Sequence, residues 1–118
     1  MPLEPRDELY LGDMRAYALE VVRFMRGSTI DYFGPDSQLR RAVERSLEIV
    51  GEAAGRVSIP VQEEHPEIPW RQMVGLRNVL AHGYAAVDGV VLWEVASRDI
   101  SELIAALERI LPSAGGTP

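Results

Sequence analysis

The sequence predicts an all-α fold, an antiparallel bundle of four to five helices. Apolar residues recur at helical spacing through most of the chain, and short segments rich in Gly, Pro and Ser separate these stretches. The one segment that could be a buried strand, residues 90–95, has no second strand candidate to pair with. A chain of 118 residues has the size of one domain with one core, so we expect residues 1–118 to form a single domain with flexible tails at 1–8 and 112–118.

The first half of the chain predicts two long helices. The first, over residues 13–26, has apolar side chains at helical spacing and ends at the run Gly27-Ser28-Thr29. A short connection leads to an N-cap at Asp36 or Ser37, and the second helix then continues to about residue 57. Prolines predict a loop over residues 58–67, because a proline ring blocks regular structure.

The second half predicts three further helices. Pro69 suits the first turn of a helix that ends before Gly83. Residues 90–95 are assigned to a short helical piece rather than a strand, after a turn that ends at about Gly89. A final amphipathic helix covers residues 99–111. Short loops between consecutive helices are typical of an antiparallel bundle.

Composition and charge exclude several classes of protein. The chain is 47% hydrophobic and 25% charged, as in ordinary soluble proteins. No apolar run approaches the ~18 residues of a membrane span, and the first residues are too polar for a signal peptide. We therefore expect a cytoplasmic protein without membrane contact. The net charge of −6 argues against a nucleic-acid coat protein, which normally carries a basic field, and DNA is not an expected partner.

The segment from Gly75 to Tyr84 carries the residues most typical of chemistry. It combines Arg77, a cation that can bind phosphate, with His82, a residue type that titrates near neutral pH, and with the hydroxyl of Tyr84. Such a set can act on RNA without a metal ion. No metal site is predicted, because the chain has no cysteine and its two histidines lack ligand spacing, and we expect no cofactor.

Helical geometry sets a condition on this site. Arg77 lies in the middle of an apolar arc, where an unpaired charge is costly and needs a counter-charge or a ligand. Asn78 and His82 lie on another face, and the five-residue offset places Arg77 and His82 roughly 140° apart. We therefore expect either a bend at the end of the helix or a second copy of the chain that completes the site. Tyr84 lies just outside the last turn.

Two glycines mark the second helix. Gly51 and Gly55 share a face, and each costs about 1 kcal/mol relative to alanine, so the usual reason for them is close approach of another backbone. Two interpretations stay open: a tight helix crossing within the chain, or a groove or dimer seam beside the helix that carries Arg77. Glu52, which lies between the two glycines in the sequence, is a candidate counter-charge for Arg77.

The other polar and aromatic residues favour structural interpretations. Trp70 and Trp93 are predicted to be core aromatics rather than base-stacking platforms, and His65 a surface residue. A mixed-sign helix face is interpreted as solvated surface, with an RNA-guiding rim as the alternative. This face comprises Arg40, Arg41, Glu44, Arg45 and Glu48.

Four segments of the chain, taken in order, resemble the signature of the HEPN superfamily, and more closely that of the HepT-like toxins of prokaryotic toxin–antitoxin pairs. The Arg-x4-His pair alone is a weak signal, whereas the ordered set is specific and runs along nearly the whole chain. It consists of Ile49-Val50-Gly51-Glu52-Ala53, His65-Pro66-Glu67-Ile68-Pro69-Trp70, Arg77-Asn78…His82-Gly83-Tyr84 and Val87-Asp88…Val91-Leu92-Trp93.

The resemblance implies a HEPN-like helical bundle that forms a homodimer, with two Arg–His pairs in a shared cleft. The implied activity is metal-independent endoribonuclease, as the toxin of a type VII-like toxin–antitoxin pair. The implied partner is a small nucleotidyltransferase-type antitoxin, which in such pairs can attach AMP to the tyrosine of the motif, here Tyr84. That modification would bring bulk and negative charge into the cleft and repel RNA.

Residue types fit the implied chemistry. RNA carries its own nucleophile, the 2′-OH. His82 would accept that proton or protonate the leaving 5′-oxygen, Arg77 would hold the phosphate, and Asn78 would orient either of them. The expected product is a 2′,3′-cyclic phosphate.

Two alternatives remain at this point. A non-catalytic HEPN-type interaction module, which binds a nucleotidyltransferase or a nucleotide, would keep the fold and the dimer without cutting RNA. A small dimeric helical regulator of DNA is disfavoured by the acidic balance and by the lack of a clear helix-turn-helix. Growth arrest on expression, relieved by His82→Ala, would separate the toxin from the interaction module.

Overall fold

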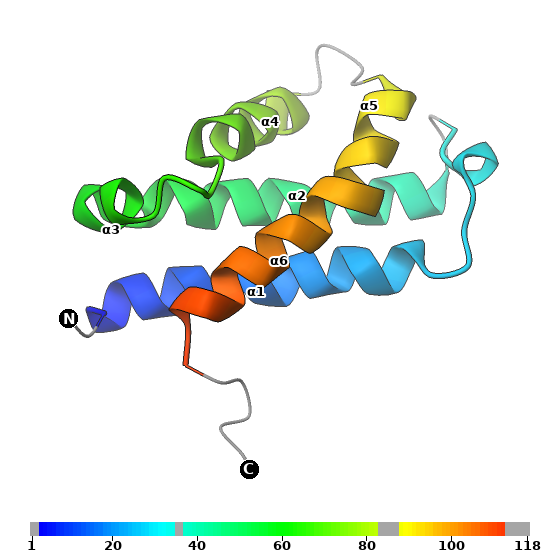
Figure 1. Ribbon diagram of the computed structural model, residues 1–118. Helices are drawn as coiled ribbons and strands as arrows, with labels where there is room; N and C mark the ends of the chain where they lie inside the picture. Colours follow the sequence, from blue (N-terminus) through cyan, green and yellow to red (C-terminus); the bar gives the residue numbers. More distant parts are fainter. Residues whose placement is uncertain (1–2, 35–36, 83–87, 113–118) are drawn as a thin grey trace.

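A computed structural model describes residues 3–34, 37–82 and 88–112, and these residues contain helices and no strand (Figure 1). The prediction of an all-α fold is confirmed. A short 3-10 helix, η1, and a π-helical segment, η2, accompany the α-helices. The elements in chain order are α1 (Pro5–Met25), η1 (Ile30–Tyr32), α2 (Gln38–Arg56), α3 (Ile59–Glu64), α4 (Trp70–His82), α5 (Gly89–Glu94), η2 (Val95–Asp99) and α6 (Ile100–Ile110).

The core lies among three helices and leaves α4 at the periphery. Helices α1 and α2 lie side by side and run in opposite directions, α6 packs across α1, and α4 packs on α2 (Figure 1). Fully buried side chains such as Leu11, Met14, Val43 and Leu107 fill the space among α1, α2 and α6. In α4 only Trp70 is buried, and the other apolar side chains of that helix are partly covered or exposed. Much of α4 is therefore accessible.

Helix α1 begins earlier than predicted. It starts at Pro5 rather than at residue 13, so residues 5–8 belong to a helix and not to a flexible tail. Proline suits a first turn because its missing N–H needs no partner there. Asp7 is 4% exposed and accepts hydrogen bonds from the main-chain N (2.8 Å) and the Oγ (2.7 Å) of Ser58. This contact with a residue 51 positions away fixes the start of α1, and no local pattern indicates it.

Helix α3 occupies part of the segment predicted as a loop. Ser58 is its N-cap residue, and Pro60 lies in the first turn, where a proline does not disturb the helix. The prolines were therefore wrongly interpreted as blocking structure over residues 58–67. The start of α2 agrees with prediction, because the side chain of Ser37 accepts a hydrogen bond from the main-chain N of Arg40 at 3.1 Å.

The C-terminal helices form a longer unit than predicted. Helix α5 begins at the N-cap Asp88, which accepts a hydrogen bond from the main-chain N of Val90 at 2.7 Å. The choice of helix over strand for this segment is confirmed. Residues 96–98, which were predicted to lie between two helices, belong to the π-helical segment η2, which joins α5 to α6 with αR backbone angles at Val95 and Asp99.

The predictions for Arg40 and for the two tryptophans have different outcomes. Arg40 was assigned to a solvated face, but it is 7% exposed, and its Nε donates to Glu44 at 3.0 Å while its Nη1 donates to the carbonyl of Phe33 at 3.4 Å. Burial among these acceptors makes it a structural arginine. Trp70 is a core aromatic as predicted, whereas Trp93 is only partly buried and packs against the core, edge-on to Phe33 with ring centroids 5.5 Å apart. Within the described ranges, the helices are too short or too polar to cross a bilayer.

Candidate functional site

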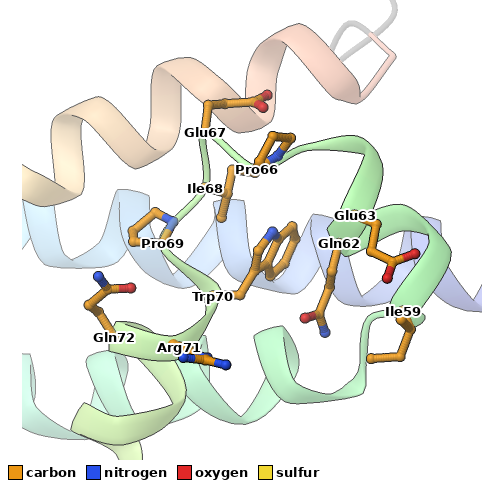
Figure 2. A pocket seen from close by; sticks show the side chains of 10 residues that line it. All are labelled: Ile59, Gln62, Glu63, Pro66, Glu67, Ile68, Pro69, Trp70, Arg71 and Gln72. Atoms are coloured by element: carbon orange, nitrogen blue, oxygen red, sulfur yellow. The ribbon is translucent and has the colours of Figure 1, made fainter.

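The first turn of α4 is anchored by Trp70. The side chain is 9% exposed, and its Nε1 donates a hydrogen bond to the carbonyl of His65 at 3.0 Å. Figure 2 shows the indole ring at the centre of the junction between α3 and α4. A buried aromatic with its N–H satisfied holds a helix end in one position. The residues downstream on α4 are therefore presented from a fixed starting point.

Gly51 allows α4 to approach α2 closely at Arg77. A Cβ atom at Gly51 would lie 2.5 Å from the Cβ of Arg77 and 2.5 Å from the carbonyl oxygen of Met73. One turn further along α2, a Cβ at Gly55 would lie 3.5 Å from the Cγ2 of Val74, which is ordinary contact. Of the two interpretations left open for these glycines, the structure shows the crossing within the chain, and that crossing lies at Arg77.

Asn78 connects the two candidate catalytic side chains. Arg77 Nη1 donates to Asn78 Oδ1 at 3.3 Å, and His82 Nδ1 lies 2.6 Å from the main-chain oxygen of Asn78. Helical side chains lean toward the N-terminus of their helix, which brings His82 back over the preceding turn. One chain thus brings Arg77 and His82 to the same residue, although their Cα–Cβ directions diverge.

The contact with Asn78 also fixes the proton on the imidazole. A carbonyl oxygen can only accept a hydrogen bond, so Nδ1 of His82 carries the hydrogen. In the neutral ring the lone pair is then on Nε2. Since His82 is exposed at the end of α4, this is the nitrogen arrangement that a general base for an external hydroxyl needs.

Arg77 is held without a carboxylate partner in the described part of the chain. Its Nε is buried and makes no hydrogen bond there. Buried donors without partners are rare in proteins, and a catalytic role or a bound ion or water is a common explanation for one. The expected ion pair with Glu52 is not present in the described structure: Glu52 Oε1 lies 3.7 Å from Arg56 Nη2 instead, because residues four apart on a helix are neighbours.

His65 and Arg98 lie apart from the contacts between Arg77, Asn78 and His82. Tyr84 lies outside the described residues. His65 is partly exposed, and its Nδ1 lies 3.4 Å from Oε2 of Glu67. In η2, the hydrogen bond to Asp99 and the charges of Asp99 and Glu94 raise the pKa of the Arg98 guanidinium above its ordinary value. No cluster of three or more His, Cys, Asp or Glu side chains suited to a metal ion occurs among residues 3–34, 37–82 and 88–112.

Sequence reasoning missed one residue on this helix. Arg71 lies 11 positions before His82, on the same flank of α4 as Asn78 and His82, and it is exposed like them. The spacing of Arg71, Gly75, Asn78 and His82, at intervals of four, three and four residues, is the signal that could have identified this flank.

Comparisons with known proteins agree on one family. The family model described as ribonuclease HepT-like matches residues 14–110. A protein of Thermococcus cleftensis named probable ribonuclease HepT is 39% identical over 102 residues, which cover 86% of this chain and 92% of the relative. A protein of Methanocaldococcus jannaschii, provisionally named as an RNase, is 35% identical over 94 residues, with coverage of 80% and 86%. No solved structure matches.

Proposed function

The chain belongs to the HepT-like ribonuclease family, and on this premise we propose that it is a metal-independent endoribonuclease that cuts RNA with Arg77 and His82. The observation that carries the proposal is that both side chains contact Asn78: Arg77 Nη1 lies 3.3 Å from its Oδ1, and His82 Nδ1 lies 2.6 Å from its main-chain oxygen. A cation for the phosphate and a base for the 2′-OH are the two groups that this cleavage requires.

The proposed reaction needs no nucleophile from the protein. Nε2 of His82 accepts the proton of the 2′-OH, the 2′-oxygen forms a bond to the adjacent phosphorus, and the bond from phosphorus to the 5′-oxygen breaks. His82, which becomes an imidazolium when it takes the proton of the 2′-OH, gives a proton to the leaving 5′-oxygen, so the proton balance closes. Arg77 stabilises the negative charge that grows on the phosphoryl oxygens. The products are a 2′,3′-cyclic phosphate and a free 5′-hydroxyl.

The proposal includes a homodimer in which the two sites share a cleft. Its support is the exposed apolar side chains on two helices: Val79 of α4 is 41% exposed, and Val90 and Val91 of α5 are 54% and 53% exposed. Helix α4 packs mainly on α2, so its outer face is open to a second copy. Light scattering behind size exclusion would give the mass, and Val79→Arg should convert a dimer to a monomer.

We further propose that the chain is the toxin of a type VII-like toxin–antitoxin pair, with a nucleotidyltransferase-type antitoxin that attaches AMP to Tyr84. This part rests on family membership alone, because Tyr84 lies outside the described residues. Incubation with a nucleotidyltransferase-type antitoxin and ATP should add the mass of one AMP to the parent chain and none to Tyr84→Phe. An unchanged intact mass of the parent would contradict this role.

The ribonuclease proposal is tested with purified protein and a labelled RNA in EDTA. We expect the parent chain to give products that end in a 2′,3′-cyclic phosphate, and Arg77→Ala and His82→Ala to give none. Cutting that stops in EDTA, or that continues in both variants, would refute the assigned mechanism. If none of the three proteins cuts RNA, and the intact mass excludes prior modification of the parent, the interaction module becomes the better explanation.

A further inference from the structure

Helix α4 carries one continuous polar flank. Arg71, Gly75, Asn78 and His82 are all exposed, and their spacing places them in line along the helix. The helix has two arginines, a histidine and no acidic residue, although the chain as a whole has a net charge of −6. On this flank Arg71 adds a positive charge outside the proposed catalytic pair, at the opposite end of α4 from His82.

We infer that Arg71 binds a second phosphate of the RNA strand, so that a single-stranded substrate lies along α4 from His82 toward α3. The inference rests on the proposed ribonuclease function and extends it to the substrate. Eleven residues of α-helix separate Arg71 from His82, which corresponds to about 16 Å. Arg77 lies six residues, or about 9 Å along the helix, from Arg71 and projects from another face, so Arg71 contacts a different phosphate from the one at Arg77.

The guanidinium of Arg71 is available for this contact. Among the described residues it has no carboxylate partner, whereas two arginines of the neighbouring helix α2 are paired: Arg45 with Glu48 at 3.3 Å and Arg56 with Glu52 at 3.7 Å. An exposed guanidinium without an ion pair can bind a phosphate bidentately. These ion pairs partly offset the charges of Glu48 and Glu52, so the two glutamates repel a nearby RNA strand less than unpaired carboxylates would.

The backbone between Arg71 and Asn78 is open to a close approach. A Cβ atom at Gly75 would meet nothing within 4 Å, so no neighbouring side chain covers this point of the flank. A strand that contacts both ends of the flank can therefore lie against the helix along its whole length.

A pocket at the junction of α3 and α4 provides space beside Arg71. It has a volume of about 580 Å³, and Figure 2 shows Arg71 and Gln72 on its α4 side and Gln62 and Glu63 on its α3 side. Its carboxylates disfavour a phosphate inside but can accept hydrogen bonds from the amino groups of a base. The phosphate therefore belongs at Arg71, with the adjoining base toward the pocket.

The test separates binding from cutting. We would measure the affinity of the full chain for a 2′-O-methyl oligonucleotide, which lacks the nucleophile, over a range of salt concentrations. Here K is the association constant, and log K falls as log salt rises. Loss of one phosphate contact on a single strand makes this dependence shallower by about 0.7, which corresponds to about fivefold weaker binding at 0.1 M salt. We expect this change for Arg71→Gln.

The matched control is Arg109→Gln, which removes the same charge from an exposed position in the last turn of α6. It should leave both affinity and slope unchanged. Equal behaviour of the two variants, or no binding by the parent chain, would overturn the inference. If the parent binds but an all-ribose RNA stays intact, the ribonuclease proposal fails while the Arg71 contact is still decided by the comparison.

Discussion

Replacing Gly51 by alanine tests the helix crossing that positions Arg77. The added Cβ would lie 2.5 Å from two atoms of α4, and ordinary contact begins at 3.4 Å, so the two helices have to separate by about 0.9 Å. The carbonyl oxygen of Met73 is a backbone atom and cannot swing aside as the end of a side chain could. Inserting a methyl group into so tight a contact costs about 1–3 kcal/mol of stability.

The expected free energy contains a second contribution of opposite sign. Alanine is favoured over glycine in a helix by about 1 kcal/mol, which offsets part of the steric cost. Two matched variants isolate the steric cost, because Gly75→Ala meets nothing within 4 Å and Gly55→Ala meets Val74 at ordinary distance. Both should stabilise the chain by up to about 1 kcal/mol. The difference between Gly51→Ala and these variants should therefore reach about 1–3 kcal/mol.

The assay is urea unfolding followed by far-ultraviolet circular dichroism, at one protein concentration because oligomerisation shifts apparent stability. A second measurement is RNA cleavage, since a displacement of about 1 Å at a reacting group can reduce the rate by two orders of magnitude. We expect Gly51→Ala to lose activity under conditions in which it is still folded. If it is stabilised as much as Gly75→Ala, the close approach of α2 and α4 is wrong.

Three further predictions concern single contacts. Asn78→Ala removes the acceptor for Arg77 but keeps the main-chain carbonyl, so the rate of cleavage in steady-state kinetics should fall about fivefold, as expected for about 1 kcal/mol. An unchanged rate would show that Asn78 does not hold Arg77. Asp7→Ala leaves the N–H and hydroxyl at the start of α3 without their acceptor and should cost about 1–3 kcal/mol in urea unfolding, and a cost near zero would contradict the buried contact. Arg40→Met removes a buried guanidinium from its acceptors and should lower the free energy of unfolding by about 1–3 kcal/mol in urea unfolding. The control Arg45→Met, at an exposed position, should change it by less than about 0.5 kcal/mol, and equal effects of the two would contradict a structural role for Arg40.

The fold class and the candidate site were visible in the sequence because both depend on local patterns. Apolar spacing predicted α2, α4 and α6 to within a few residues, since a helix that buries one face repeats its apolar side chains about every 3.6 residues. The residue types at Arg77, His82 and Tyr84 by themselves indicated chemistry on RNA. Gly51 and Gly55 indicated a close approach of another backbone, although not which one.

The tertiary structure decided what depends on contacts between distant segments. It placed Gly51 against Arg77, brought Asp7 to Ser58 across 51 positions, and buried Arg40 in what the sequence presented as a solvated face. It also paired Glu52 with Arg56 rather than with Arg77. Local sequence determines whether a segment can be helical and which residues share a face. The partner that meets each face depends on how the helices pack, and that choice belongs to the whole chain.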